Sequence, residues 1–128
     1  MRAPSSYDYA LIRVVPSVER GECLNVGVIL FCRTLRFLGV RIHVDEERLR
    51  TLAPDLDMAA VQQQLDDIVQ ICEGRQEAGQ LANMSQSERF HWLVSPRSTI
   101  IQPSPVHMGL SADPEATLEH LLKTMVYR

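Results

Sequence analysis

Apolar residues follow a two-residue alternation over the N-terminal third of the chain. Residues 7–15, 23–33 and 36–44 are rich in aromatic and β-branched side chains, which is typical of β-strands. Only short links separate these segments, so the pattern predicts an antiparallel meander of three strands. The middle strand is apolar at both odd and even positions, which indicates a central strand covered on two faces. Strict alternation places five side chains on one of its faces: Leu24, Val26, Val28, Leu30 and Cys32.

From Asp45 onward the apolar residues recur at three- and four-residue steps, which is typical of amphipathic helices. Asp45 is predicted to cap a short helix that ends before Pro54. A second helix is predicted from about Asp57 to Gly74, a residue type that commonly ends helices. Asp113, followed by proline and glutamate, predicts the start of a C-terminal helix.

The segments between these helices carry weaker patterns. Residues 73–82 are polar and predict a loop, whereas residues 85–88 form a capping-box pattern that opens a short helix. Residues 98–102 predict a fourth strand, and residues 103–109 a stiff, irregular loop with two prolines. The whole pattern predicts one α+β domain over residues 1–128. Its small, mainly antiparallel sheet consists of the three-strand N-terminal meander plus a later strand, and helices pack on it.

Composition narrows the class of protein. Apolar residues make up 45% and charged residues 23% of the chain, and no apolar run approaches the ~20 residues of a transmembrane helix. The N-terminal residues lack a signal-peptide pattern, so we expect a cytoplasmic location. Three cysteines without a close pair indicate reduced thiols, and the four histidines are scattered. We therefore expect no metal site and no cofactor.

Charge is distributed unevenly along the chain. The net charge is −3, but residues 1–44 carry six arginines against three acids, whereas residues 45–128 carry seven basic residues against thirteen acids. The acidic total disfavours a dedicated nucleic-acid binder. The basic N-terminal part leaves a specific nucleic-acid contact open as a minor alternative.

Five segments carry a recognisable combination of motifs: residues 9–16, 19–22, 25–28, 98–107 and 113–115. The most specific part is Arg-Gly-Glu at residues 20–22 followed by Asn-Val-Gly at residues 25–27. Over residues 7–126, the chain resembles the bacterial family catalogued as domain of unknown function 3037. The resemblance implies a small cytoplasmic protein, often encoded beside a kinase-like protein similar to the HipA toxins. No activity is established for that family, so the resemblance assigns no catalytic residue.

Polar or flexible residues inside the predicted strands are the first binding candidates. Asn25 and Gly27 are unusual in a central strand. Either they bind a ligand, or Gly27 lies under a large helix side chain and Asn25 holds the loop before residue 23. Arg13 interrupts an apolar strand, and it either binds an anion or pairs with Glu22 or Glu19.

Two further places carry candidate residues. Arg20 lies in the predicted turn before Glu22, where a charge is either solvated or part of a binding site. Arg97, Ser98 and His107 lie in or beside the proline-containing segment, and a rigid loop with such groups is suited to ligand binding. The alternative is a loop shaped by its prolines, with an exposed imidazole.

No complete catalytic set is present, because the sequence lacks a Gly-x-Ser-x-Gly motif and a phosphate-binding loop. The leading hypothesis is therefore a non-enzymatic interaction or accessory module for a protein partner, with the HipA-like kinase as the candidate by family association. A homodimer through an exposed third or fourth strand is also open. The alternative is a small enzyme or ligand-binding domain for a phosphorylated or nucleotide-like compound that uses five residues: Arg13, Arg20, Asn25, Arg97 and His107.

Overall fold

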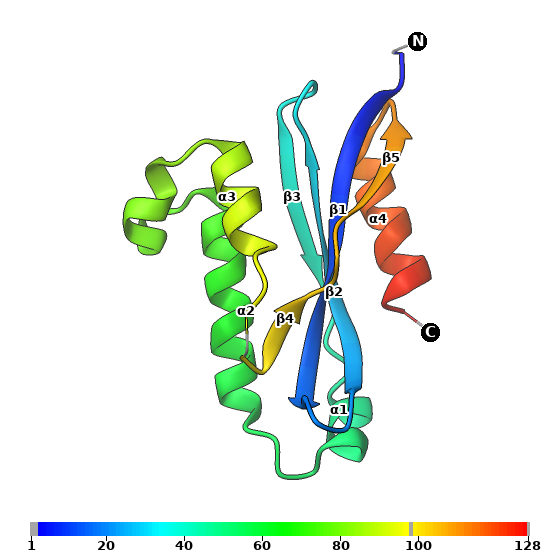
Figure 1. Cartoon of the computed structure of the whole chain (residues 1–128), viewed down its shortest axis with the longest axis vertical. Coiled ribbons are helices and arrows are strands. Elements are labelled where there is room, and N and C mark those ends of the chain that lie inside the picture. The colour runs from blue at the N-terminus through cyan, green and yellow to red at the C-terminus, as the bar shows by residue number, and fades with distance from the viewer. Residues whose placement is uncertain (1–2, 98, 128) are drawn as a thin grey trace.

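The protein is described here by a computed structural model that covers residues 3–97 and 99–127 (Figure 1). Within these residues, five strands form one open antiparallel sheet in the order β3-β2-β1-β4, and β5 pairs with β1 as well. The predicted α+β class is confirmed. In chain order, the elements are β1 (Ser5–Ser17), β2 (Glu22–Cys32), β3 (Phe37–Ile42), α1 (Glu46–Leu52), α2 (Met58–Glu73), the 3-10 helix η1 (Gln76–Asn83), α3 (Gln86–Leu93), β4 (Ile101–Pro103), β5 (His107–Ser111) and α4 (Pro114–Met125).

The predicted helix starts are confirmed by side-chain caps. The carboxylates of Asp45, Asp57 and Asp113 each accept a hydrogen bond from the backbone N–H three residues later. Ser85 and Glu88 form the reciprocal pair of a capping box at the start of α3. The Ser85 backbone N–H, which donates to Glu88, lowers the pKa of that carboxyl. Local side-chain chemistry therefore determines where these helices begin.

Helices cover both faces of the sheet. On one face, α2 contacts β3 and α3 contacts β2 and β3; on the other, α4 contacts β2 and β3. The two faces carry separate buried clusters, which we call the α2-side core and the α4-side core. Arg41 of β3 holds α4 in place, because its Nε donates to Glu119 at 2.5 Å and its Nη2 to Glu115 at 3.4 Å. None of the described helices is both long and apolar enough to cross a membrane.

A β-bulge in β2 overturns the strict alternation predicted for this strand. Ile12 of β1 pairs with Gly27, but the next residue, Arg13, pairs with Asn25, so Val26 is the extra residue. Val26 packs in the α2-side core, whereas three residues that alternation places beside it pack in the α4-side core: Val28, Leu30 and Cys32. The alternation restarts at the bulge, so the predicted common face of these residues is wrong.

Two strands follow α3, where the sequence predicted one strand and a loop. The predicted strand at residues 98–102 is β4, which lies slightly later, and the predicted irregular loop contains β5. β4 pairs with the C-terminal half of β1, and β5 pairs with its N-terminal half, on the edge opposite β2. The prolines suggested a loop, but they fall at the end of β4 and between the two strands, where an edge tolerates a missing N–H.

Ser104 closes the gap between β4 and β5. Its side chain is buried, and its hydroxyl accepts a hydrogen bond from the Leu11 N–H at 2.7 Å. The Ser104 N–H donates to the Leu11 carbonyl at 2.8 Å, and the hydroxyl donates to the Pro105 carbonyl at 2.9 Å. Ser104 thus provides hydrogen-bond partners for the N–H and the carbonyl of Leu11, at the point of β1 where neither β4 nor β5 pairs with it.

The segment at residues 73–82 is not the predicted loop. It contains the end of α2 and most of η1, whose regular conformation is interrupted at Gly79. The N–H of Ala78 donates to the carbonyl of Arg75, a local bond of the 3-10 type. Such short turns need no apolar periodicity, so the sequence pattern did not reveal them.

We expect Ser104→Ala to destabilise the protein by about 1–3 kcal/mol, because it leaves the buried Leu11 N–H without an acceptor. Urea denaturation followed by circular dichroism measures this change in the free energy of unfolding. Ser95→Ala is the matched control, because the Ser95 hydroxyl is exposed and, among the described residues, bonds only the His91 carbonyl. The control is expected to change stability by less than about 0.5 kcal/mol. Equal effects of the two substitutions would contradict the bridging role of Ser104.

Candidate functional site

The structure separates the sequence-predicted site residues. Arg13 and Asn25 face the end of α4, and Arg20 with Glu22 lies at the β1–β2 turn. Gly27 lies inside the sheet. Two of the remaining candidates lie elsewhere: Arg97 at the end of α3 and His107 on β5. Ser98 lies outside the described residues.

Arg13 and Asn25 form a short relay to the C-terminal end of α4. The Nε of Arg13 donates to Asn25 Oδ1 at 3.2 Å, and Asn25 Nδ2 donates to the carbonyl of Met125 at 3.1 Å. Asn25 therefore joins α4 to the sheet and does not hold the β1–β2 loop. The bulge makes this possible, since it sets Asn25 directly opposite Arg13.

Glu22 pairs with Arg20 and not with Arg13. Arg20 Nε lies 2.5 Å from Glu22 Oε1, and the Arg20 side chain is 75% exposed. An ion pair this open to solvent contributes between zero and about 1 kcal/mol. The predicted alternative in which Arg13 pairs with Glu22 or Glu19 is therefore wrong. Glu22 lies against Arg20, and among the described residues no ion pair joins Arg13 to Glu19.

Gly27 is required by close packing between strands. A Cβ at this position would lie 2.9 Å from the Arg41 carbonyl oxygen and 3.2 Å from side-chain carbons of Ile12 and Ile42. The prediction that Gly27 lies under a large helix side chain is wrong, because its large neighbours come from the adjacent strands. No approach of a ligand is needed to explain this glycine.

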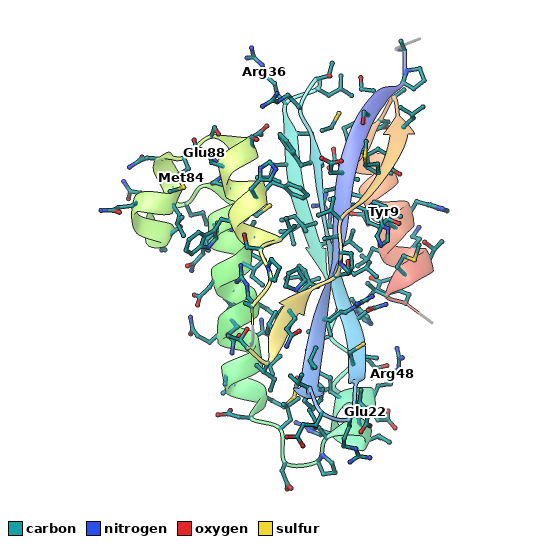
Figure 2. All side chains as sticks on the ribbon, in the orientation of Figure 1. Tyr9, Glu22, Arg36, Arg48, Met84 and Glu88 are labelled. Carbon is teal, nitrogen blue, oxygen red and sulfur yellow. The ribbon has the colours of Figure 1, made fainter. Side chains whose placement is uncertain are left out.

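Arg97 and His107 lie away from the other candidates. Arg97 Nη2 donates to the Trp92 carbonyl at 2.7 Å and so caps the end of α3. It lines a narrow cavity on the α2-side core beside Ile12, whereas Arg13 faces α4 on the opposite side of the sheet. The His107 ring lies 5.3 Å from that of Tyr9, and Figure 2 shows Tyr9 well separated from Glu22 along the sheet. The five residues of the predicted ligand site are thus not brought together.

Two neighbouring cavities lie at the end of the molecule where Figure 2 labels Glu22 of β2 and Arg48 of α1. One, of about 750 Å³, lies between the start of β2 and α1; the other, of about 460 Å³, lies between β2 and the end of α4. They share Cys23, Leu24 and Arg48. We call the two cavities together the arginine groove; its central residues are Arg13, Cys23, Leu24, Asn25 and Arg48.

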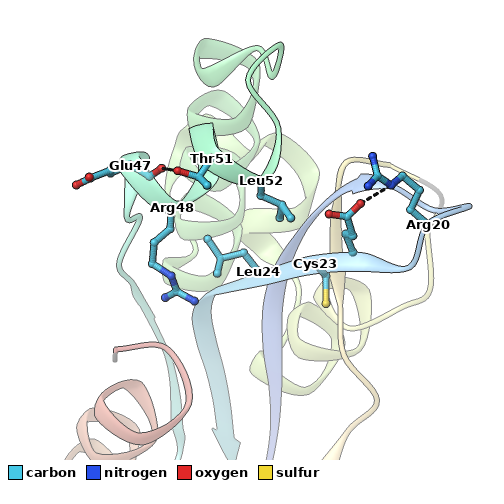
Figure 3. A pocket seen from close by; sticks show the side chains of 8 residues that line it. Arg20, Cys23, Leu24, Glu47, Arg48, Thr51 and Leu52 are labelled. Atoms are coloured by element: carbon cyan, nitrogen blue, oxygen red, sulfur yellow. Dashed lines mark hydrogen bonds and ion pairs between the residues drawn. The ribbon is translucent and has the colours of Figure 1, made fainter.

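Figure 3 shows how side chains lie around the larger cavity. Arg48 extends from α1 past Leu24, while the Glu47 carboxylate points away from the Arg48 guanidinium. Arg48 was not predicted as a site residue, because a lone arginine in a short polar helix is usually a solvated surface residue. Its only distinguishing signal is its place three residues after the helix cap Asp45.

The three thiols differ in accessibility. Cys23 is exposed in the arginine groove, whereas Cys32 and Cys72 are each only 1% exposed. Burial raises the pKa of the Cys72 thiol to about 12, and the adjacent Glu73 carboxylate adds to this shift. Within residues 3–97 and 99–127, no three His, Cys, Asp or Glu side chains lie close enough to hold a metal ion.

Fold and surface together define a small α+β protein whose candidate polar side chains lie in open surface depressions and at capping positions. The chain belongs to the family described as "Protein of unknown function (DUF3037)", whose sequence profile matches residues 9–126. The resemblance drawn from the sequence motifs is thereby confirmed. Neither the curated proteins nor the solved structures contain a significant match to this chain.

We expect a thiol reagent to modify Cys23 alone in the folded protein. Cys32 and Cys72 are shielded, and at pH 8 a thiol with a pKa of about 12 is ionised in only about one molecule in ten thousand. Mass spectrometry after brief iodoacetamide treatment should detect a single alkylation, and urea should expose the other two thiols. Rapid labelling of Cys72 without denaturant would contradict this burial.

A double-mutant cycle distinguishes the two candidate partners of Arg13. Arg13→Ala combined with Asn25→Ala should show a coupling energy of about 0.5–1.5 kcal/mol, the net contribution of one hydrogen bond. Arg13→Ala combined with Glu22→Ala is the control cycle, and its coupling should stay below about 0.5 kcal/mol. Chemical denaturation of the single and double variants provides these values. A larger coupling with Glu22 would overturn the observed pairing.

Proposed function

We propose that this protein is an interaction module of the bacterial cytoplasm that binds a protein partner along the outer edge of β5. The partner contributes an extended apolar segment, which adds to the sheet as a further strand. The family association makes the HipA-like kinase the candidate partner. The observation that carries the proposal is an exposed, uncharged edge strand with large apolar side chains.

The backbone of β5 is available on one side. β5 pairs with β1, and no other strand of residues 3–97 and 99–127 pairs with it. Sheet edges of this kind are usually protected by charged residues or by a covering element. The sequence from residue 99 to residue 112 contains no Asp, Glu, Lys or Arg. The edge is therefore suited to strand addition by another chain.

The side chains of β5 support a protein partner. Met108 is 74% exposed, Leu110 is 72% exposed and Val106, just before the strand, is 43% exposed. Met108 and Leu110 pair with Asp8 and Ser6 of β1, on the face opposite α4. On that face α2 and α3 pack against β2, β3 and β4, and Figure 1 shows both helices away from β5. An apolar row at an open edge gives a partner strand both hydrogen bonds and a surface to cover.

Co-expression with the HipA-like kinase, followed by size-exclusion chromatography with light scattering, tests the proposal. The two proteins should co-elute at micromolar concentration. Replacing both Met108→Lys and Leu110→Lys should weaken the complex at least about tenfold, because charge at an edge opposes strand addition. Val18→Lys is the matched control, since Val18 is a similarly exposed apolar residue in the β1–β2 turn, and it should leave the complex intact.

Three outcomes would overturn the proposal. Separate elution of the two proteins would exclude the kinase, and a complex that survives both lysine substitutions would exclude the β5 edge. If the wild-type chain alone elutes as a dimer that the same substitutions dissociate, the partner is a second copy of this chain, and the heterologous interaction is wrong.

A further inference from the structure

Among the residues that the structure describes, the arginine groove presents two guanidinium groups without an acidic side chain beside them. Among the described residues, no Asp or Glu oxygen lies within 4.0 Å of Arg13 or Arg48. Arg20, the third arginine nearby, is already paired with Glu22. The depression therefore carries local positive charge on a protein whose net charge is −3.

Arg13 is held in position with its terminal nitrogens free. Its Nε donates to Asn25, and Asn25 is in turn fixed by the Met125 carbonyl. Within residues 3–97 and 99–127, its Nη1 and Nη2 have no protein acceptor. A guanidinium held in this way has less conformational entropy to lose when it binds an oxyanion.

Arg48 approaches the same cavity from a different element. Its backbone N–H donates to the Asp45 carboxylate at 3.1 Å, which fixes the first turn of α1. Its side chain extends toward the end of α4, and the Glu47 carboxylate points the other way (Figure 3). Both arginines line the cavity of about 460 Å³, so two planar donor groups from different elements face one space.

The geometry points to a binding site for the phosphate group of a small molecule in the arginine groove. A phosphate monoester carries about −1.5 to −2 charges at neutral pH, which matches two guanidinium groups better than one carboxylate does. The cavity volume lies in the range of small-molecule sites, roughly 300–1,000 Å³. The adjoining cavity, lined by Leu24, Thr51 and Leu52 together with charged residues that include Arg20, Glu22 and Glu47, receives the remainder of the ligand.

This site is independent of the proposed protein interaction. The groove lies among β1, β2, α1 and α4, and none of the residues lining its cavities belongs to β5. Phosphate binding is therefore unchanged by Met108→Lys with Leu110→Lys. Either proposal can fail while the other stands.

Inorganic phosphate, titrated into 15N-labelled protein at constant ionic strength, tests the site. Saturable NMR shifts are expected at the amides of residues 23–25 and at the Arg13 Nε, with a Kd on the order of 1 mM. Arg48→Gln should weaken binding at least about tenfold. Arg50→Gln is the matched control, because Arg50 lies on the same helix, is exposed and pairs with Glu46; it should change the Kd less than about twofold.

A second variant separates position from charge. Arg13→Lys keeps the positive charge but loses the Nε contact to Asn25, and it should weaken phosphate binding several-fold while the circular dichroism spectrum is retained. Non-saturable shifts, an equal response to acetate at matched ionic strength, or wild-type affinity in Arg48→Gln would each overturn the assignment.

Discussion

Pairing both edges of β1 is the constraint on which the rest of the molecule depends. β2 occupies one edge along most of the strand, and β3 lies on the far side of β2. The other edge has to be filled by chain that returns after α3, and β4, Ser104 and β5 fill it in turn. Since α3 precedes this return segment and α4 follows it, the segment also carries the chain from one face of the sheet to the other.

The parts of the fold that local chemistry determines could be predicted from the sequence. The β-branched runs of β1 and β2, the carboxylate cap at Asp45 and the capping box at Ser85 each act within a few residues. β5 could not be predicted in this way, because its residues have weak strand preference and follow prolines. It is a strand because the N-terminal half of β1 offers it an unpaired edge. The bulge at Val26 likewise depends on register between strands and leaves no periodic pattern.

The candidate site was predictable only in part, for the same reason. Asn25 was conspicuous as an amide in an apolar strand, and it does have a specific partner. That partner is the carbonyl of Met125, which lies 100 residues further along the chain, so no spacing rule could identify it. Arg97 and His107 were grouped with Arg13 in one predicted ligand site, but they lie at other places in the fold because each belongs to a different element. Arg48 lies in the groove because α1 and the start of β2 line the same cavity, and this depends on tertiary structure.

The single carboxamide of Asn25 makes two hydrogen bonds. The oxygen of that group holds the guanidinium of Arg13, and its nitrogen holds the last turn of α4. Because both bonds share a rigid planar group, rotation that breaks one also strains the other. Movement of the helix end and the orientation of Arg13 are therefore thermodynamically linked, and such linkage is reciprocal. An oxyanion that fixes Arg13 therefore stabilises the contact between α4 and the sheet. By reciprocity, loss of that contact weakens oxyanion binding by the same free energy.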